Sequence, residues 1–182
     1  MPHYQEPIYE KAYGYVQVRI GAEEKVARLI NSLFSDIQAY AIKQIKHRSR
    51  MGVRSYASSL MVPGYVIFRT QRNYQITKLQ TISSIMRILT YSDNSWQLRG
   101  EDFCCAKWVY DHHGVVGVSI AYIENDIIRI SDGPLKEVEE RIVRIDKRNQ
   151  NALVTLGLHQ EKCKIWLAFN WMDSLHTRRI NA

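Results

Sequence analysis

The sequence predicts an α+β protein made of two small units, an N-terminal α/β sandwich followed by a small SH3-like β-barrel. Three observations lead to this prediction. The chain has 182 residues, which suffices for one medium domain or two small ones. Strand-like and helix-like segments alternate up to about residue 111, as in an α/β sandwich. From residue 123 onward, short β-rich runs separated by turn residues replace them, which is typical of a small closed barrel.

The first unit begins with a strand and an amphipathic helix. Residues 13–20 are rich in β-formers and end at Gly21, which indicates a strand. Gly21 is a suitable N-cap, and Glu23 and Glu24 then lie in the first helical turn, where the helix dipole favours acidic groups. The next apolar residues have the i, i+3, i+4, i+7 spacing of one helical face. They are Val26, Leu29, Ile30 and Leu33.

The remainder of the first unit alternates strands with less regular segments. Residues 37–45 predict a second strand, and the polar, basic stretch 46–59 predicts a loop or a mobile hairpin tip. Pro63 and Gly64 mark a turn before a β-forming run at residues 65–68. Residues 72–83 are weakly helical and residues 85–89 predict a strand. A helix is expected over residues 101–110, with Phe103, Ala106 and Tyr110 roughly on one side.

The second unit is predicted to consist of strands. Residues 127–130, 141–145, 152–158 and 162–169 have the composition and alternation of strands. In the last of these, Cys163, Ile165 and Leu167 would point one way, and Lys164 and Trp166 the other. We therefore expect a first domain at residues 1–112, a short linker at residues 113–122 and a second domain at residues 123–182.

The charge distribution favours a polyanionic partner. The formal net charge is +7, and no acidic residue lies between Asp36 and Asp93. A field of one sign attracts phosphates and makes binding depend on salt. A solvated basic face that only keeps the protein soluble is the alternative. For the basic residues of segment 46–54, nucleic-acid contact and a solvated loop remain equally open.

Several other classes of protein are disfavoured. The longest apolar runs are too short to span a bilayer, and the N-terminus lacks the pattern of a signal peptide. Three cysteines in such a chain suggest reduced thiols in a cytoplasmic protein, and we expect a monomer. The cluster Cys104, Cys105, His112 and His113 suggests zinc, but adjacent cysteines lack metal-ligand spacing. No catalytic motif is present, so we expect neither an enzyme nor a bound cofactor or metal.

Four segments follow one another along the chain: the strand at 13–20, the Gly21-Ala22-Glu23-Glu24 helix start, Pro63-Gly64-Tyr65-Val66, and the segment 125–135 with its Asp132-Gly133-Pro134 turn. In this order they resemble the NusG family of transcription elongation factors. The first three are similar to its N-terminal (NGN) domain, and the fourth is similar to the opening strand and turn of the KOW module. The resemblance runs from about residue 13 to residue 173. It implies an NGN domain followed by a KOW barrel, with a non-enzymatic role on RNA polymerase.

Departures from the family pattern indicate a specialised member. Glu140 stands where the KOW module usually has a glycine, and the segment before Pro63 lacks the basic and aromatic residues of the general factor. The chain looks closest to the LoaP group of processive antitermination factors, which implies recruitment by a leader RNA hairpin or another nucleic-acid element. The first alternative is the general NusG factor, whose KOW module bridges polymerase to Rho or ribosomal protein S10. The second is a basic KOW-containing RNA-binding protein of translation.

The resemblance also implies sites. The polymerase clamp helices would bind an exposed apolar concavity formed by Tyr13, Tyr15, Met61, Val62, Tyr65 and Phe68. Alternate residues of these strands must face the domain's own core, so a core role for any one of them is an equally open alternative. The non-template DNA strand would contact Arg19, Lys25, Arg28, Arg69 and Arg72. An RNA hairpin would contact Arg141, Arg144, Lys147 and Arg148, unless Glu137, Glu139 and Glu140 pair with these arginines.

Overall fold

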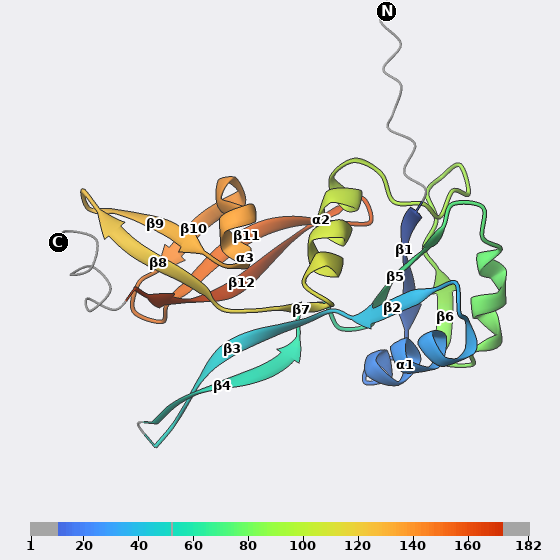
Figure 1. Cartoon of the computed structure of the whole chain (residues 1–182), viewed down its shortest axis with the longest axis horizontal. Helices are drawn as coiled ribbons and strands as arrows, with labels where there is room; N and C mark the ends of the chain where they lie inside the picture. Colours follow the sequence, from blue (N-terminus) through green and yellow to red (C-terminus); the bar gives the residue numbers. More distant parts are fainter. Residues whose placement is uncertain (1–10, 52, 173–182) are drawn as a thin grey trace, which may run out of the picture.

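A computed structural model describes residues 11–51 and 53–172 and shows a mixed α+β protein built mostly of strands (Figure 1). The N-terminal segment used to argue against a signal peptide, and the end of the predicted second domain at residues 173–182, lie outside the described residues. Within the described residues, no helix is long and apolar enough to cross a membrane.

The N-terminal half contains a four-stranded sheet with a helix on each face. Its strand order is β2 (Gln38–Ala41), β5 (Tyr65–Gln71), β1 (Lys11–Val18), β6 (Ile85–Ile88). Helix α1 (Glu23–Leu33) covers one face, where Val26 and Ile30 pack with Val16 and Val66. Helix α2 (Gly100–Asp111) covers the other face. Alternate strand residues supply an apolar surface to each of the two helices.

Helix α1 begins one residue later than the predicted cap implies. Ala22, not Gly21, is the N-cap, and Gly21 has a positive φ of 87°. The predicted apolar stripe is only partly buried, since Val26 and Ile30 are inaccessible, whereas Leu33 is 61% exposed. The weakly helical stretch before β6 contains a single 3-10 helix, η1 (Ile76–Thr81).

The segment predicted as one strand followed by a loop or a mobile hairpin tip forms a long hairpin. After β2 the chain forms β3 (Lys43–Arg50) and β4 (Val53–Leu60), which pair antiparallel along their full length. This hairpin projects away from the first sheet and runs beside the C-terminal half (Figure 1). Of the two alternatives, the loop is wrong and a hairpin is present. The extent of its strands was not predicted, because polar residues hide the period of a strand that is largely solvent-facing.

The C-terminal half is a curled five-stranded sheet (Figure 1). Its order is β10 (Ile142–Asp146), β11 (Asn151–Leu158), β12 (Glu161–Trp171), β8 (Ser119–Glu124), β9 (Ile127–Asp132). Among the described pairings, none joins β9 to β10 to close a full barrel. Short helices α3 (Pro134–Glu137) and η2 (Glu139–Arg141) connect these two edge strands.

The predicted Asp132-Gly133-Pro134 turn has a steric reason. Gly133 has a positive φ of 90°, and a Cβ there would lie 2.7 Å from the Cα of Ser119. Ser119, fully buried, uses its Oγ to accept a 2.9 Å hydrogen bond from the amide of Leu135. Only glycine lets the chain pass this close to β8 and enter α3.

The predicted linker is mostly ordered secondary structure. Strand β7 (Val115–Val116) pairs parallel with β3, and β8 begins at Ser119, inside the expected linker range. The five-stranded sheet therefore begins four residues before the predicted start of the second domain. The two halves are joined through paired strands rather than by a free tether.

Candidate functional site

Helix α2 is buried on two sides and joins the two halves of the molecule. Towards the first sheet, the ring of Tyr13 makes edge-to-face contacts with Phe103 and Tyr110 at 5.5 and 5.4 Å between centroids. Towards the C-terminal half, the indole Nε1 of Trp108 donates to the carbonyl of Pro134 at 3.3 Å. His112 Nε2 lies 3.0 Å from Glu137 of α3. A helix with apolar groups on both sides is shared between two layers.

The six predicted polymerase-binding residues do not share one face. Tyr13, Tyr15 and Met61 belong to the core on the α2 side, with the half-buried Val62 and Tyr65 packed against it. Phe68 lies on the α1 side, fully buried and stacked on Trp96. Phe68 therefore does not belong to the predicted concavity, because strand alternation places it on the face opposite to its neighbour Ile67.

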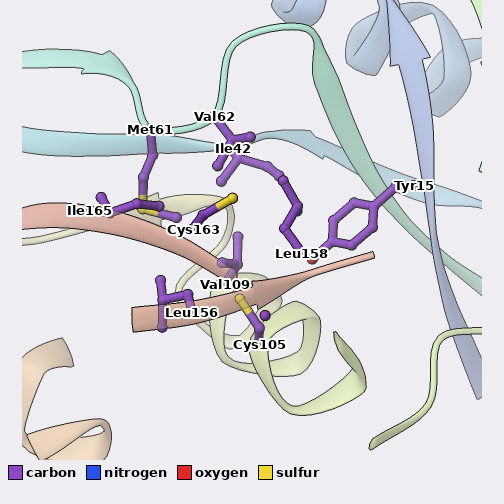
Figure 2. A pocket seen from close by; sticks show the side chains of 11 residues that line it. Tyr15, Ile42, Met61, Val62, Cys105, Val109, Leu156, Leu158, Cys163 and Ile165 are labelled. Atoms are coloured by element: carbon purple, nitrogen blue, oxygen red, sulfur yellow. The ribbon is translucent and has the colours of Figure 1, made fainter. Parts of the chain in front are cut away.

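The C-terminal hairpin β11–β12 covers part of the α2-side face. Tyr15, Met61 and Val62 line a small cavity together with Leu156, Leu158, Cys163 and Ile165 of that hairpin (Figure 2). Cys105 and Val109 of α2 complete its wall. Tyr65 borders a second pocket with Leu158 and His159. We call this contact between the α2-side face and the β11–β12 hairpin the junction.

One buried carboxylate accepts the main hydrogen bonds of the junction. Asp102 Oδ2 accepts a 2.7 Å hydrogen bond from the hydroxyl of Tyr91 and a 2.9 Å bond from the amide of Gln160 at the hairpin tip. His159 stacks on the Tyr91 ring at 5.2 Å between centroids. Burial, and then the bond to Asp102, raise the pKa of Tyr91 to about 12. These contacts fix the hairpin tip against the N-terminal end of α2.

The β3–β4 hairpin ties the other end of β12. The Nε2 of His47 lies 2.9 Å from the carbonyl of Phe169. The Tyr56 hydroxyl and the Asn170 side chain exchange hydrogen bonds of 2.8 and 3.2 Å. His47 and Tyr56 are cross-strand partners, so they present one side of the hairpin to β12. Lys46 and Arg48 have the opposite strand parity and are exposed.

Two groups at the junction are held in their neutral forms. Burial raises the pKa of Tyr15 well above its usual range, and the Cys105 thiol and Asp102 carboxylate act in the same direction. Burial likewise raises the pKa of the Cys105 thiol to about 12. The junction is therefore a desolvated environment that disfavours charge.

The predicted DNA-binding residues fall into two groups. Arg19, Lys25 and Arg28 are exposed on or beside α1. Arg69 lies over the Tyr110 ring at 4.3 Å and donates to Gln38, and Arg72 donates to Gln97 at 3.0 Å. The first group is exposed, whereas each arginine of the second group makes a side-chain contact within the protein.

Three of the predicted RNA-binding residues are exposed at one end of the C-terminal sheet. Arg144 lies on β10, and Lys147 and Arg148 lie in the turn that follows. Arg141 is half-buried, and its Nε lies 3.6 Å from Glu140. Of the acids that offered an alternative, Glu137 contacts His112 and Glu139 contacts Lys136. The three cations lie on β10 and the turn after it and are exposed, and RNA contact by them stays a prediction.

The cysteines and histidines considered for zinc are separated. Cys104 is exposed and its neighbour Cys105 is buried. His112 contacts Glu137. In the part of the chain that the structure describes, no group of three or more histidine, cysteine or acidic side chains is placed to hold a metal ion.

Sequence reasoning missed the residues that hold the junction together. Asp102 looked like one of two ordinary acids in a first helical turn, alongside Glu101. Gly157 looked like an ordinary strand glycine, but its Cβ position is 3.2 Å from the Cβ of Glu101. The two-residue turn His159-Gln160 between strands was the one available signal, because it marks a tight hairpin tip.

Comparisons with known proteins give likenesses among solved structures alone. Neither a protein-family model nor a curated protein matches the chain. Among solved structures, the chain is similar to NusG of Thermotoga maritima, from a study of domain interaction in that protein. Identity is 16%, the match covers 87% of this chain and 93% of that one, and the TM-score is 0.46. A likeness of this size carries no argument about function, so the proposal below rests on the residues of this chain.

Proposed function

We propose that this chain is a transcription elongation factor that binds RNA polymerase and promotes processive antitermination, in the manner of a specialised NusG-family protein. Two features of the chain support the proposal. The Pro63-Gly64-Tyr65-Val66 strand precedes the Asp132-Gly133-Pro134 turn in the order of the NGN and KOW modules. An α/β sheet with a helix on each face precedes a curled β-sheet, which is the architecture expected for that pair.

The observation that carries the proposal is the apolar surface at the junction. Tyr15, Met61, Val62 and Tyr65 gather on one side of the first sheet, where aromatic and thioether groups offer a large, adaptable contact area. The occupant of that surface is the hairpin of the chain's own second unit. Polymerase clamp helices are proposed to take the place of β11–β12 on this surface.

Because the surface is covered, the proposal requires an equilibrium between a closed and an open arrangement. The apparent affinity for the clamp helices then equals the intrinsic affinity reduced by the open fraction. Any change that weakens the junction without damaging the surface should tighten polymerase binding. Binding of a nucleic-acid element to the basic faces would raise the local concentration of this protein near the polymerase. The gain would offset part of the free energy needed to open the junction.

Gly157→Ile is the variant that separates the two arrangements. A Cβ at Gly157 already approaches Glu101 and Asp102 of α2 at 3.2 and 3.3 Å, so a β-branched side chain would push the hairpin away. Isoleucine also favours strand geometry, so β11 itself should persist. Thr155→Ile, two residues earlier on the same strand, is the matched control.

The test measures binding of the purified full chain to the isolated clamp helices of RNA polymerase. We expect Gly157→Ile to bind at least about fivefold more tightly than the wild type, and Thr155→Ile to match the wild type. Adding Val62→Glu to Gly157→Ile should abolish the gain, since Val62 lies on the proposed contact surface. If none of these proteins binds the clamp helices, the proposal is wrong.

A terminator readthrough assay addresses the antitermination step and the alternative functions. A specialised factor should increase readthrough when a leader hairpin lies upstream and have little effect without it. Equal effects on both templates, together with binding to Rho or ribosomal protein S10, would favour the general factor. Binding to RNA without any binding to polymerase would favour the role in translation.

A further inference from the structure

The outer face of strands β10, β11 and β12 presents an exposed tryptophan among cations. Along β12, Lys162, Lys164 and Trp166 have one parity, whereas Cys163 and Ile165 have the other and line the junction cavity. Trp166 is 37% exposed, and because the indole side chain is large, this fraction leaves a substantial area accessible to solvent. It has no ring-stacking partner among the described residues.

The strand register places other groups of this face beside Trp166. Its cross-strand partner on β11 is Leu153, which in turn pairs with Arg144 on β10. The β10–β11 register shifts between Ile142 and Arg144, so Val143 is displaced and 57% exposed. A bulge of this kind re-aims the adjacent side chain. Trp166, Leu153 and Arg144 thus form one row across three strands.

The cations of this face are free of ion pairs. Within the described residues, Arg144, Lys162 and Lys164 have no carboxylate within 4.0 Å. The neighbouring acid Asp146 is engaged in its own turn, where it accepts bonds from the amide and side chain of Asn149 at 3.0 and 2.7 Å. Glu161 has the opposite parity on β12. Hydrogen bonds from Asn149 lower the pKa of the Asp146 carboxyl group, and Arg144 lies close enough to act in the same direction, so the charge of this face is partly balanced. The face still combines an exposed aromatic group with three cations that form no ion pair within 4.0 Å among the described residues.

We propose that this face binds single-stranded nucleic acid, with a base stacked on Trp166 and phosphates beside Lys162, Lys164 and Arg144. Base–aromatic stacking is available only to unpaired bases, and a cationic groove follows the backbone. Lysines two residues apart on a strand are separated by about 7 Å, close to the spacing of successive phosphates in an extended strand. A protein partner would also suit an exposed tryptophan, but three cations without an ion pair on the same face favour a polyanion.

This inference extends the proposed function by naming the ligand of the second unit. It rests on that function in one respect only, namely where the single-stranded nucleic acid comes from. An unpaired loop of a leader RNA hairpin and an exposed DNA strand have the same relevant chemistry. The test therefore includes both. Binding to the clamp helices is measured on the same variants, so that failure of either proposal is seen separately.

The experiment is fluorescence anisotropy of the full chain with a labelled single-stranded RNA, a DNA of the same sequence and a blunt RNA duplex. Trp166→Ala should weaken single-strand binding by about tenfold or more, and Trp166→Phe should stay within about threefold because its ring can still stack. Lys164→Gln should lower the slope of log affinity against log salt by about 0.7. Lys78→Gln on η1 is the charge-matched control and should change neither quantity.

Each outcome decides the inference. Preference for the single strands, loss with Trp166→Ala and retention with Trp166→Phe would support it, and the stronger of the RNA and DNA arms would identify the source. Equal binding of the duplex, or unchanged binding by a folded Trp166→Ala, would overturn it. Clamp-helix binding that falls with Trp166→Ala while RNA binding is unchanged would show that the face is a protein-docking surface instead.

Discussion

The backbone amide of Gln160 donates a 2.9 Å hydrogen bond to the carboxylate of Asp102, which joins the tip of the C-terminal hairpin to the first turn of α2. His159 and Gln160 both have positive φ, 47° and 69°, as the tight two-residue turn between β11 and β12 requires. This turn directs the Gln160 amide out of the hairpin. This hydrogen bond joins two residues that are 58 positions apart in sequence, and it thereby fixes how the two halves meet.

Asp102→Ala should destabilise the protein and loosen the junction. Removing the buried carboxylate leaves the Tyr91 hydroxyl and the Gln160 amide without their acceptor, at a cost of about 2–3 kcal/mol in the free energy of unfolding. Urea unfolding followed by fluorescence measures it. Glu101→Ala, at the exposed neighbouring position, is the control. Equal unfolding midpoints for the two variants would show that the Asp102 contacts contribute little.

Gly14→Ala should disturb the core on the α1 side. A Cβ at Gly14 would lie 2.8 Å from Cε1 of Phe68 and 3.0 Å from Trp96, two rings that stack at 5.5 Å. Overpacking of this kind costs about 1–3 kcal/mol. The control is Gly117→Ala, where nothing lies within 4 Å and a small gain in stability is expected. Thermal unfolding compares the two, and a Gly14→Ala protein as stable as Gly117→Ala would contradict the packing described.

Stability should fall at alkaline pH, partly through Cys105. Its thiol pKa is raised to about 12 by burial in the folded protein, so above the ordinary thiol pKa the unfolded chain releases a proton that the folded chain keeps. The free energy of unfolding is therefore unaffected below about pH 8 and falls by about 1.4 kcal/mol per pH unit above about pH 9. Denaturant unfolding from pH 7 to pH 10.5 measures this slope. Cys105→Ala should reduce it and the exposed Cys104→Ala should not; identical slopes would exclude Cys105 as the source.

The cations of α1 and those of β5 should behave differently towards DNA. Lys25→Gln with Arg28→Gln should lower the salt slope of single-strand binding by about 1.4, since both side chains are exposed. Arg69→Gln should mainly lower stability, because Arg69 lies over the Tyr110 ring at 4.3 Å. Binding titrations at several salt concentrations, with unfolding curves for each variant, separate these effects. A larger salt-slope change from Arg69→Gln than from the α1 pair would reverse the assignment.

Much of the local structure was predictable, because the periodicity of a strand or a helix is set by residues that are close in sequence. The strand at β1, the stripe of α1, the Pro63-Gly64 turn before β5 and the strands β9 to β12 were expected near their observed positions, whereas β8 lies mostly in the segment predicted as a linker. Errors occurred where periodicity was weak. The β3–β4 segment was predicted as a loop or a mobile hairpin tip and its long strands were missed, because its polar residues give little contrast between faces. Strand β7 was placed in a linker, because two residues carry no period at all.

By itself the sequence determined the order of the elements, the basic stretch without acids and the set of apolar groups available for burial. The tertiary structure alone decided which faces meet. It placed Phe68 on the α1 side, put Tyr15 and Met61 beneath β11–β12, and left Trp166 outside among free cations. The physical reason is that burial is a property of contacts between distant segments, and many pairings of apolar faces satisfy the same local pattern. Packing shape and a few polar ties, such as Asp102 with Gln160, select one of them.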